Sequence, residues 1–344
     1  MIKAFFHRSR IYPLILILAV FVVWKIRQGK KSDFVSFSGL TMGSITYNIK
    51  YIDKKHRDFK PQVDSLLKDF NNSLNHYQPD SEISQFNTDT IFHFKSSYFY
   101  PVLKRSKEVY ELTNGAFDPT IGQLINAWGF GPDAWQKMDS SMIDSLKQLV
   151  YFENITFNRD MVRKEKAGIK LDFSAIAKGY AVDIIADFIR NQGIEHLFVE
   201  IGGELTCNGN NEEGKPWVIG IIDPRSDLIN QETFASLNIS GKAMATSANN
   251  YNYIVKKGIR YVHTIDPATG YPIQNNLLSA TVVASDCMTA DAFATAFMVM
   301  GLEKSIYLLE SEDSLQGILI YNDQDGIKTY VSKELKDNFN ILND

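Results

Sequence analysis

The spacing of apolar residues along the chain predicts helices and strands in mixed order. Apolar side chains recur at helical spacing in four segments: 63–74, 98–112, 286–301 and 302–309. Shorter alternating or β-branched runs predict strands at 197–201, 217–222, 234–239, 251–255, 261–265 and 280–284, with a last strand at 317–321. Because helices do not alternate strictly with strands, we expect an α+β fold with mixed, largely antiparallel sheets and packed helices.

Turn residues divide the remaining sequence into further elements. Residues 34–51 contain Gly39 and Gly43 and predict two strands joined by a turn, while 150–170 predicts a hairpin that turns near 158–160. The polar segment 133–147 predicts a helix. We expect a short strand at 171–173, followed by a helix that ends at Asn191 with Gly193 as its stop.

The stretch 279–301, SATVVASDCMTADAFATAFMVMG, carries the first candidate chemistry, because a strand leads directly into a helix capped near Asp286. Asp291 and Thr295 lie four residues apart and share one helix face. Two hard oxygen ligands on a rigid face suit Mg²⁺. On spacing alone, a solvated Asp291 is the commoner outcome. The surrounding alanines and phenylalanines are typical of buried surface, however, and a buried carboxylate needs a partner.

Three more features are each weak alone. Lys178 lies near the first turn of its predicted helix, where a cation is unfavourable unless an anion binds; the alternative is a side chain that extends into solvent. Gly202 and Gly203 interrupt a strand, and they permit either a ligand's close approach or simply a tight turn. His263 precedes a turn containing proline and glycine, and a lone strand histidine is more often a packed one.

Composition narrows the class of protein. The 344 residues are 44% hydrophobic and 22% charged, which is typical of a globular chain long enough for a full core. The formal net charge of −4 argues against nucleic-acid binding through a basic surface. With only Cys207 and Cys287, we expect two buried thiols rather than a disulfide framework.

The N-terminal segment differs from the rest. An apolar run at 11–24 is flanked on both sides by basic residues, with no small-x-small cleavage site after it. We interpret residues 1–31 as an uncleaved signal-anchor in the inner membrane. Residues 32–344 then form a globular domain, long enough for two subdomains, on the periplasmic side. The alternative is a buried helix of the globular domain.

Taken together, the segments resemble one family. They are TMGS (41–44), YQPDSEISQFN (77–87), GAFDPTIGQLINAWGFG (115–131), LDFSAIAKGYAVD (171–183), VEIGGEL (199–205), ATSANN (245–250), HTIDPATGYP (263–272) and the stretch 279–301. In this order they resemble the ApbE-type flavin transferases (FAD:protein FMN transferases). Four positions depart from the family pattern: Ser44, Ala248, Phe173 and Ser174.

The resemblance implies a set of site residues. It places Mg²⁺ between the backbone carbonyl of Ala175 and the side chains of Asp291 and Thr295, so the helix should begin after Ala175. It implies that FAD, as substrate, is bound by Met42, Tyr77, Asp118, Lys178, Gly202, Gly203, Glu204, Ser247 and His263. Tyr77 is expected near the isoalloxazine ring, and Lys178 beside the phosphates. Lys178 and His263 are the candidate catalytic residues, with His263 as the base.

The reaction so implied is Mg²⁺-dependent. A threonine or serine hydroxyl of a partner protein attacks the FMN-side phosphorus of FAD, forms a phosphoester and releases AMP. The acceptor is expected among the subunits of membrane redox complexes. Two alternatives remain: a Mg²⁺-dependent FAD pyrophosphatase that uses water as acceptor, and a membrane-tethered FAD-binding protein without turnover.

Overall fold

In this computed structural model, the described residues are 33–131, 138–226, 229–249, 253–256 and 259–342. The predicted signal-anchor, residues 1–31, therefore lies outside the described residues. Within the described part of the chain, no helix combines the length and apolarity needed to cross a membrane.

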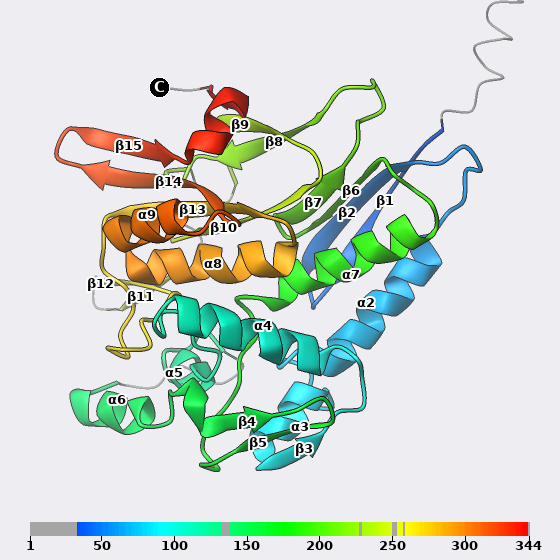
Figure 1. Cartoon of the computed structure of the whole chain (residues 1–344). Helices are drawn as coiled ribbons and strands as arrows, with labels where there is room; N and C mark the ends of the chain where they lie inside the picture. The colour runs from blue at the N-terminus through cyan, green and yellow to red at the C-terminus, as the bar shows by residue number, and fades with distance from the viewer. Residues whose placement is uncertain (1–32, 132–137, 227–228, 250–252, 257–258, 343–344) are drawn as a thin grey trace, which may run out of the picture.

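An eight-stranded sheet forms the centre of the fold (Figure 1). Its strands follow the spatial order β1 (Phe34–Thr41), β2 (Ile45–Ile52), β6 (Leu197–Ile201), β7 (Glu204–Asn208), β10 (Lys242–Ala248), β13 (Leu277–Ala284), β14 (Gln316–Asp323) and β15 (Gly326–Val331). Every neighbouring pair in this sheet is antiparallel. The prediction of an α+β fold with largely antiparallel sheets is confirmed.

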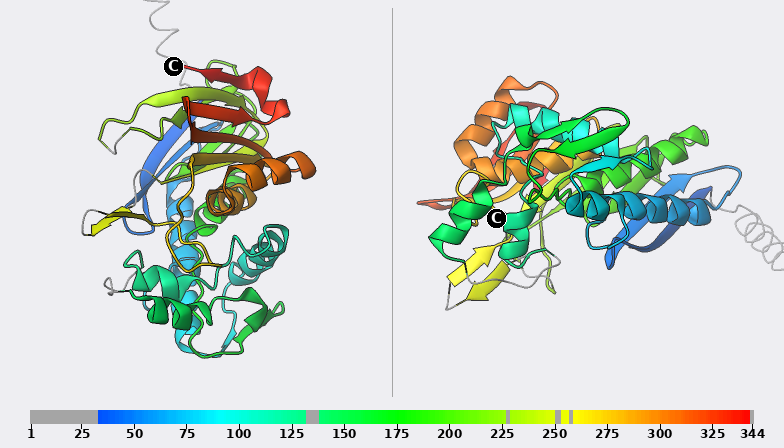
Figure 2. Two further views of the ribbon diagram at one scale, coloured as in Figure 1. Left: turned by 90° about the vertical axis from the view of Figure 1, so that its left-hand side faces the viewer. Right: turned by 90° about the horizontal axis from the view of Figure 1, so that it is seen from below.

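Different layers cover the two faces of this sheet (Figures 1 and 2). One face packs against helices and shares the largest buried core with them. These helices are α2 (Lys60–Leu74), α7 (Ala177–Asn191), α8 (Cys287–Met300) and α9 (Leu302–Ser311), and α4 (Phe99–Leu112) packs in turn on α8. The opposite face packs against a three-stranded sheet made of β8 (Trp217–Ile222), β9 (Thr233–Ile239) and β16 (Phe339–Ile341).

The elements between residues 82 and 164, apart from α4, form a smaller region beside the helical layer (Figure 1). It holds a second three-stranded sheet, whose buried side chains join the main core, and short helices around a separate buried cluster that includes Leu124 and Ile143. Its elements are α3 (Glu82–Thr88), β3 (Ile91–His93), α5 (Gly122–Ala127), α6 (Ser140–Lys147), a 3₁₀ turn (Phe152–Asn154), β4 (Ile155–Phe157) and β5 (Met161–Lys164). The remaining elements are the hairpin β11 (Tyr253–Lys256) and β12 (Ile259–Val262), and a 3₁₀ segment (Lys333–Asn338).

Several sequence predictions need correction. Residues 171–173 do not form a strand, because the segment is hydrogen-bonded to side chains and loops instead of to a ladder. The strands predicted at 251–255 and 261–265 correspond to β11 and β12, which pair as a hairpin. β12 begins and ends earlier in the sequence than predicted, and residues 251–252 lie outside the described part. The strand at 317–321 is not the last one, since β15 and β16 follow it. The helix predicted over 133–147 is α6, and residues 132–137 lie outside the described part.

Other predictions are confirmed. Both Cys207 and Cys287 are buried free thiols. The helix of the 279–301 stretch begins after Asp286, whose carboxylate accepts a hydrogen bond from the Thr289 N–H, and it ends at Gly301. The helix α7 begins at Ala177, as the interpretation of Ala175 required.

Candidate functional site

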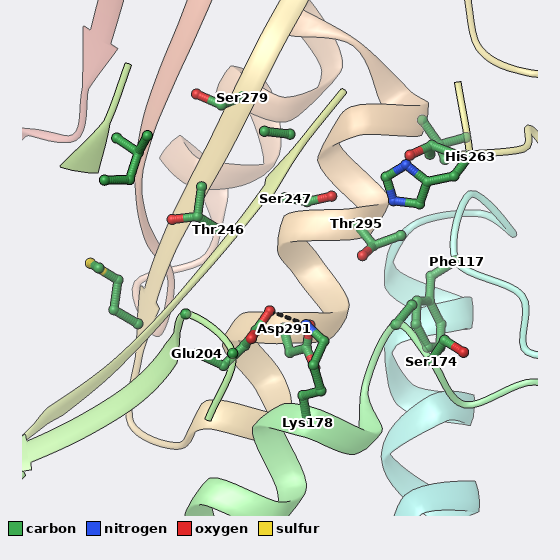
Figure 3. A pocket seen from close by; sticks show the side chains of 18 of the residues that line it. Phe117, Ser174, Lys178, Glu204, Thr246, Ser247, His263, Ser279, Asp291 and Thr295 are labelled. Carbon is green, nitrogen blue, oxygen red and sulfur yellow. Dashed lines mark hydrogen bonds and ion pairs between the residues drawn. The ribbon is translucent and has the colours of Figure 1, made fainter. Parts of the chain in front are cut away.

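The candidate site is a cavity of about 810 Å³ lined by segments far apart in the sequence (Figure 3). Its wall includes ten of the residues predicted to bind FAD or metal: Asp118, Ala175, Lys178, Gly202, Gly203, Glu204, Ser247, His263, Asp291 and Thr295. The cavity lies where α7 and α8 meet the ends of β6, β7 and β10.

Close packing of α7 on α8 creates the first part of the site. A Cβ atom on Gly179 would lie 2.2 Å from the carbonyl oxygen of Cys287, so only glycine fits there. The N–H of Gly179 donates to Asp291 Oδ2 across the helix pair at 2.9 Å. In a regular helix, the Gly179 N–H would donate to the carbonyl of Ala175, four residues earlier. Because it donates to the Asp291 carboxylate instead, it does not occupy the Ala175 carbonyl, and Ala175 lines the cavity.

A second contact between these helices involves Asp183. Its two carboxylate oxygens accept hydrogen bonds from the N–H groups of Cys287 and Met288, each at 2.8 Å. The first N–H groups of α8 are thus satisfied by a side chain of α7. Burial raises the pKa of Asp183 to about 7, although both hydrogen bonds act to lower it.

The turn between β6 and β7 supplies the opposite wall. Gly202 and Gly203 have φ values of 58° and 98° and form a two-residue hairpin loop, for which glycine is favoured at both positions. The N–H of Gly203 donates to Glu200 Oε1 at 2.6 Å. The tight-turn interpretation of these glycines is confirmed, and the turn also borders the cavity.

Charged side chains converge at the centre of the cavity (Figure 3). The ammonium of Lys178 donates to Glu204 Oε1, and it lies 3.9 Å from Asp291 Oδ1. Glu204 and Asp291 are both buried, at 3% and 4% exposure. Two carboxylates face one ammonium, so this cluster carries one excess negative charge when all three groups are ionised.

The pKa values reflect this imbalance. Burial alone would lower the pKa of Lys178, but the carboxylates of Asp291 and Glu204 raise it well above its ordinary value. Burial raises the pKa of Glu204 to about 7, with the Asp291 charge adding to the rise and Lys178 opposing it. Burial likewise raises the pKa of Asp291.

The Oε2 atom of Glu204 is buried without a hydrogen-bond partner. The cluster is therefore suited to a further cation or donor.

Two of the predicted FAD-binding residues are not in the cavity wall. Met42 sits in the β1–β2 turn with a positive φ of 47° and packs against the core. Tyr77 is 57% exposed; its hydroxyl donates to the Phe130 carbonyl, and its ring stacks on His76 with a centroid distance of 4.3 Å. His76 lies 3.7 Å from Asp172, which does line the cavity. Tyr77 is thus connected to the cavity wall through His76.

The remaining predicted residues line the cavity from separate loops. Asp118 is buried, and its Oδ1 accepts hydrogen bonds from the Thr120 N–H and hydroxyl at 2.8 and 2.6 Å. Burial raises the pKa of Asp118 to about 6. Ser247 and His263 face the cavity near Thr295 (Figure 3). Phe130 packs edge-on against His263 at 6.4 Å between ring centroids.

Sequence reasoning missed most of one wall of the cavity. Thr246 and Ser279 belong to this wall and lie inside the segments 245–250 and 279–301, which the sequence singled out without giving either residue a role. The rest of the wall is Met244 on β10 and residues of β8, among them Ile219 and Ile221. The pattern of these last three residues is that of ordinary strands, and only the packing of the smaller sheet on β10 makes them cavity residues. Ser174 and Asp172 also line the cavity, and both lie inside the LDFSAIAKGYAVD segment that the sequence already singled out.

Comparisons with known proteins place the chain in a family. Residues 42–319 match the model of the ApbE family. The FAD:protein FMN transferase of Vibrio cholerae is 38% identical over 316 residues, covering 89% of this chain and 93% of that protein. The Escherichia coli (strain K12) FAD:protein FMN transferase is 32% identical over 315 residues, covering 89% of each chain. This chain belongs to the ApbE family.

Solved structures extend the agreement to three dimensions. The flavin transferase ApbE from Vibrio cholerae superimposes with a TM-score of 0.81 at 37% identity, covering 90% of this chain and 100% of that one. The apo flavinyl transferase ApbE of Pseudomonas stutzeri gives a TM-score of 0.79 at 30% identity, covering 89% and 96%.

Proposed function

We propose that the chain transfers the FMN moiety of FAD to a protein, and that the cavity between α7, α8 and the β6–β7 turn is where this happens. The observation that carries the proposal is the cluster of Lys178, Glu204 and Asp291. It lies within a cavity that is large enough for a nucleotide ligand. The family membership supplies the reaction class, and the cluster supplies residues for it.

The proposed reaction is attack by a threonine or serine hydroxyl of the acceptor on the FMN-side phosphorus of FAD. A P–O bond to the acceptor oxygen forms, and the bond to the AMP oxygen breaks. Phosphoryl transfer depends mainly on positioning and on neutralising charge. Lys178 lines the cavity, its ammonium would contact the diphosphate, and its raised pKa keeps it protonated at neutral pH.

The residues present fit a magnesium ion. Among the described residues, no group of three or more His, Cys, Asp or Glu side chains could hold a metal, so a metal here must also use other oxygen donors. The proposed ligands are Asp291, Thr295 and the Ala175 carbonyl, all hard oxygens of the kind Mg²⁺ prefers. The excess negative charge and the orphaned Glu204 Oε2 support a cation at this place. When bound, Mg²⁺ would neutralise phosphate charge.

His263 is the proposed base. It faces the cavity beside Thr295, on the side opposite Lys178 (Figure 3). An unperturbed imidazole has a pKa suited to accepting the proton of the attacking hydroxyl near neutral pH. Ser247 lines the same cavity and would bind the diphosphate or the reacting hydroxyl.

The proposal extends to the partner and the location. A signal-anchor at residues 1–31 would hold the catalytic domain on the periplasmic side of the inner membrane, close to acceptor subunits of membrane redox complexes. Basic residues on both sides of the apolar run support such an anchor. Protease treatment of spheroplasts that degrades the catalytic domain would agree with this location, whereas protection until lysis would contradict it.

Replacement of Asp291 by Ala tests the metal assignment. The variant should lose Mg²⁺-dependent flavin transfer, measured as covalent flavin fluorescence on an acceptor domain after denaturing electrophoresis. A matched control is Asp187→Ala, an exposed aspartate of α7 that pairs with Arg190. Full Mg²⁺-dependent activity in the Asp291 variant would overturn the assignment.

A further inference from the structure

The loop 171–175 presents Ser174 and Ala175 to the cavity, yet it belongs to no helix or strand. A metal ligand supplied by a main-chain carbonyl needs a backbone held in place, because no side-chain rotamer can compensate for its displacement. The residues that hold this loop come from the small region of the fold, including the end of the segment YQPDSEISQFN, to which the proposed function gives no role.

Asn87, the last residue of that segment, binds both main-chain groups of Leu171. Its side-chain amide donates to the Leu171 carbonyl at 2.9 Å, and its Oδ1 accepts from the Leu171 N–H at 2.7 Å. The amide therefore replaces the strand partner that a ladder would have provided. This pair of bonds attaches the start of the loop to the C-terminal end of α3.

Lys164 reinforces the same junction from β5. Its side chain is only 2% exposed, and its ammonium donates to the carbonyls of Phe86, Asn87 and Ile169 at 3.1, 3.0 and 2.8 Å. All three acceptors are main-chain oxygens. One buried cation thus joins the end of α3 to the chain just before the loop. Burial lowers the pKa of Lys164 to about 8, so the contact is kept despite its desolvation cost.

The other end of the loop is attached to the cavity wall. The Asp172 N–H donates to the Pro119 carbonyl at 2.8 Å, next to the cavity residue Asp118. The Ser174 N–H donates to Asp172 Oδ1 at 2.8 Å. The Phe173 carbonyl accepts from the N–H groups of Ile176 and Ala177, which turns the chain sharply into α7.

We propose that Asn87 and Lys164 are positioning residues that hold the loop 171–175 so that the Ala175 carbonyl can serve as a magnesium ligand. This inference rests on the proposed function, because the metal is part of it. Neither residue lines the cavity. Asn87 acts through the main chain of Leu171, and Lys164 acts through that of Ile169.

The test uses Asn87→Ala and Lys164→Met in the full chain. The control for the first is Asn158→Ala, because Asn158 Oδ1 also accepts two main-chain N–H bonds, in the β4–β5 turn. The control for the second is Lys166→Met, whose ammonium donates to the Gln148 carbonyl in an exposed contact. Mg²⁺ is titrated calorimetrically into each protein in the presence of ADP. FAD binding in EDTA is followed by quenching of flavin fluorescence.

We expect both positioning variants to bind Mg²⁺ at least about tenfold more weakly, the size of effect seen when residues that orient metal ligands are removed. Metal-free FAD binding should change less than twofold, and both controls should match the wild type. If Asn87→Ala binds Mg²⁺ with wild-type affinity and shows only a lowered melting temperature, then Asn87 has a purely structural role and the inference is overturned. Asn87→Ala decides the matter if Lys164→Met does not fold, because it leaves all three lysine contacts, which go to main-chain carbonyls, in place.

The outcome also separates this inference from the proposed function. If the wild-type chain binds no Mg²⁺, the metal assignment fails and the positioning role fails with it. If the wild type and both variants bind Mg²⁺ equally well, only the positioning role fails.

Discussion

At the scale of single residues, the candidate site contains a few charged side chains whose partners come from distant parts of the chain. Lys178 was a weak candidate from sequence, because a lysine near a helix start can equally well extend into solvent. In the structure its ammonium pairs with Glu204 and lies near Asp291. The predicted role of Asp291 gains support from its 4% exposure and from the Gly179 N–H bond, neither of which residue spacing alone reveals.

The raised pKa of Glu204 predicts a pH-dependent stability in metal-free buffer. Its pKa is about 7 in the fold against an ordinary value of 4.5, so between these pH values the folded protein binds more protons than the unfolded chain. Stability should therefore fall as the pH rises from about 5 to about 7. Glu204→Gln should flatten this slope, as measured by urea unfolding in EDTA. An unchanged slope in the variant would show that other groups cause it.

His263→Gln tests the proposed base. A side chain that accepts the proton of the attacking hydroxyl typically contributes about 10²- to 10⁴-fold in rate. We expect kcat for flavin transfer to drop by an amount in this range, with FAD binding retained by fluorescence quenching. If FAD binding is lost in parallel, His263 acts in binding instead.

At the scale of elements, the helix pair α7 and α8 is the part of the site that the sequence predicted best. The small residues of 286–301 and the helical repeat after residue 176 indicated two helices, and both form within a residue or two of the expected ends. Their contact was not predictable, because it depends on Gly179 fitting under the Cys287 carbonyl. The loop 171–173 was misassigned as a strand for a related reason: its hydrogen bonds go to Asn87 and Pro119, far away in sequence.

Gly179→Ala tests whether the helix contact shapes the site. The new Cβ would lie 2.2 Å from a main-chain oxygen, which forces the helices apart. Overpacking of this kind costs roughly 1–3 kcal/mol in the free energy of unfolding. Flavin transfer should fall by more than about tenfold, since a small misplacement of catalytic groups has large effects. Gly168→Ala is the control, because its Cβ would meet only the flexible Leu149 side chain at 3.0 Å. Full activity in Gly179→Ala would argue against the contact as a determinant of the site.

At the scale of the whole molecule, the cavity forms where the eight-stranded sheet, the helix pair and the loops of the small region meet. The α+β class and most of the strands could be predicted from alternation and turn residues. The wall made by β8 and Met244 could not be predicted, because nothing in the sequence of β8 distinguishes a cavity residue such as Ile219 from an ordinary core position. The family resemblance is spread over eight segments, and ten of the residues that it implied line one cavity in the structure. Met42 and Tyr77 lie outside the cavity wall.

The most direct measurement follows both products of the reaction. The purified full-length chain is incubated with FAD, Mg²⁺ and an acceptor domain that carries a threonine or serine site, and the acceptor mass and the released AMP are quantified together. The proposed function predicts an acceptor that gains one FMN phosphoester for each AMP released, with little free FMN. Release of AMP and free FMN with an unmodified acceptor would identify a pyrophosphatase, intact FAD would identify a binding protein, and either result would contradict the transferase function.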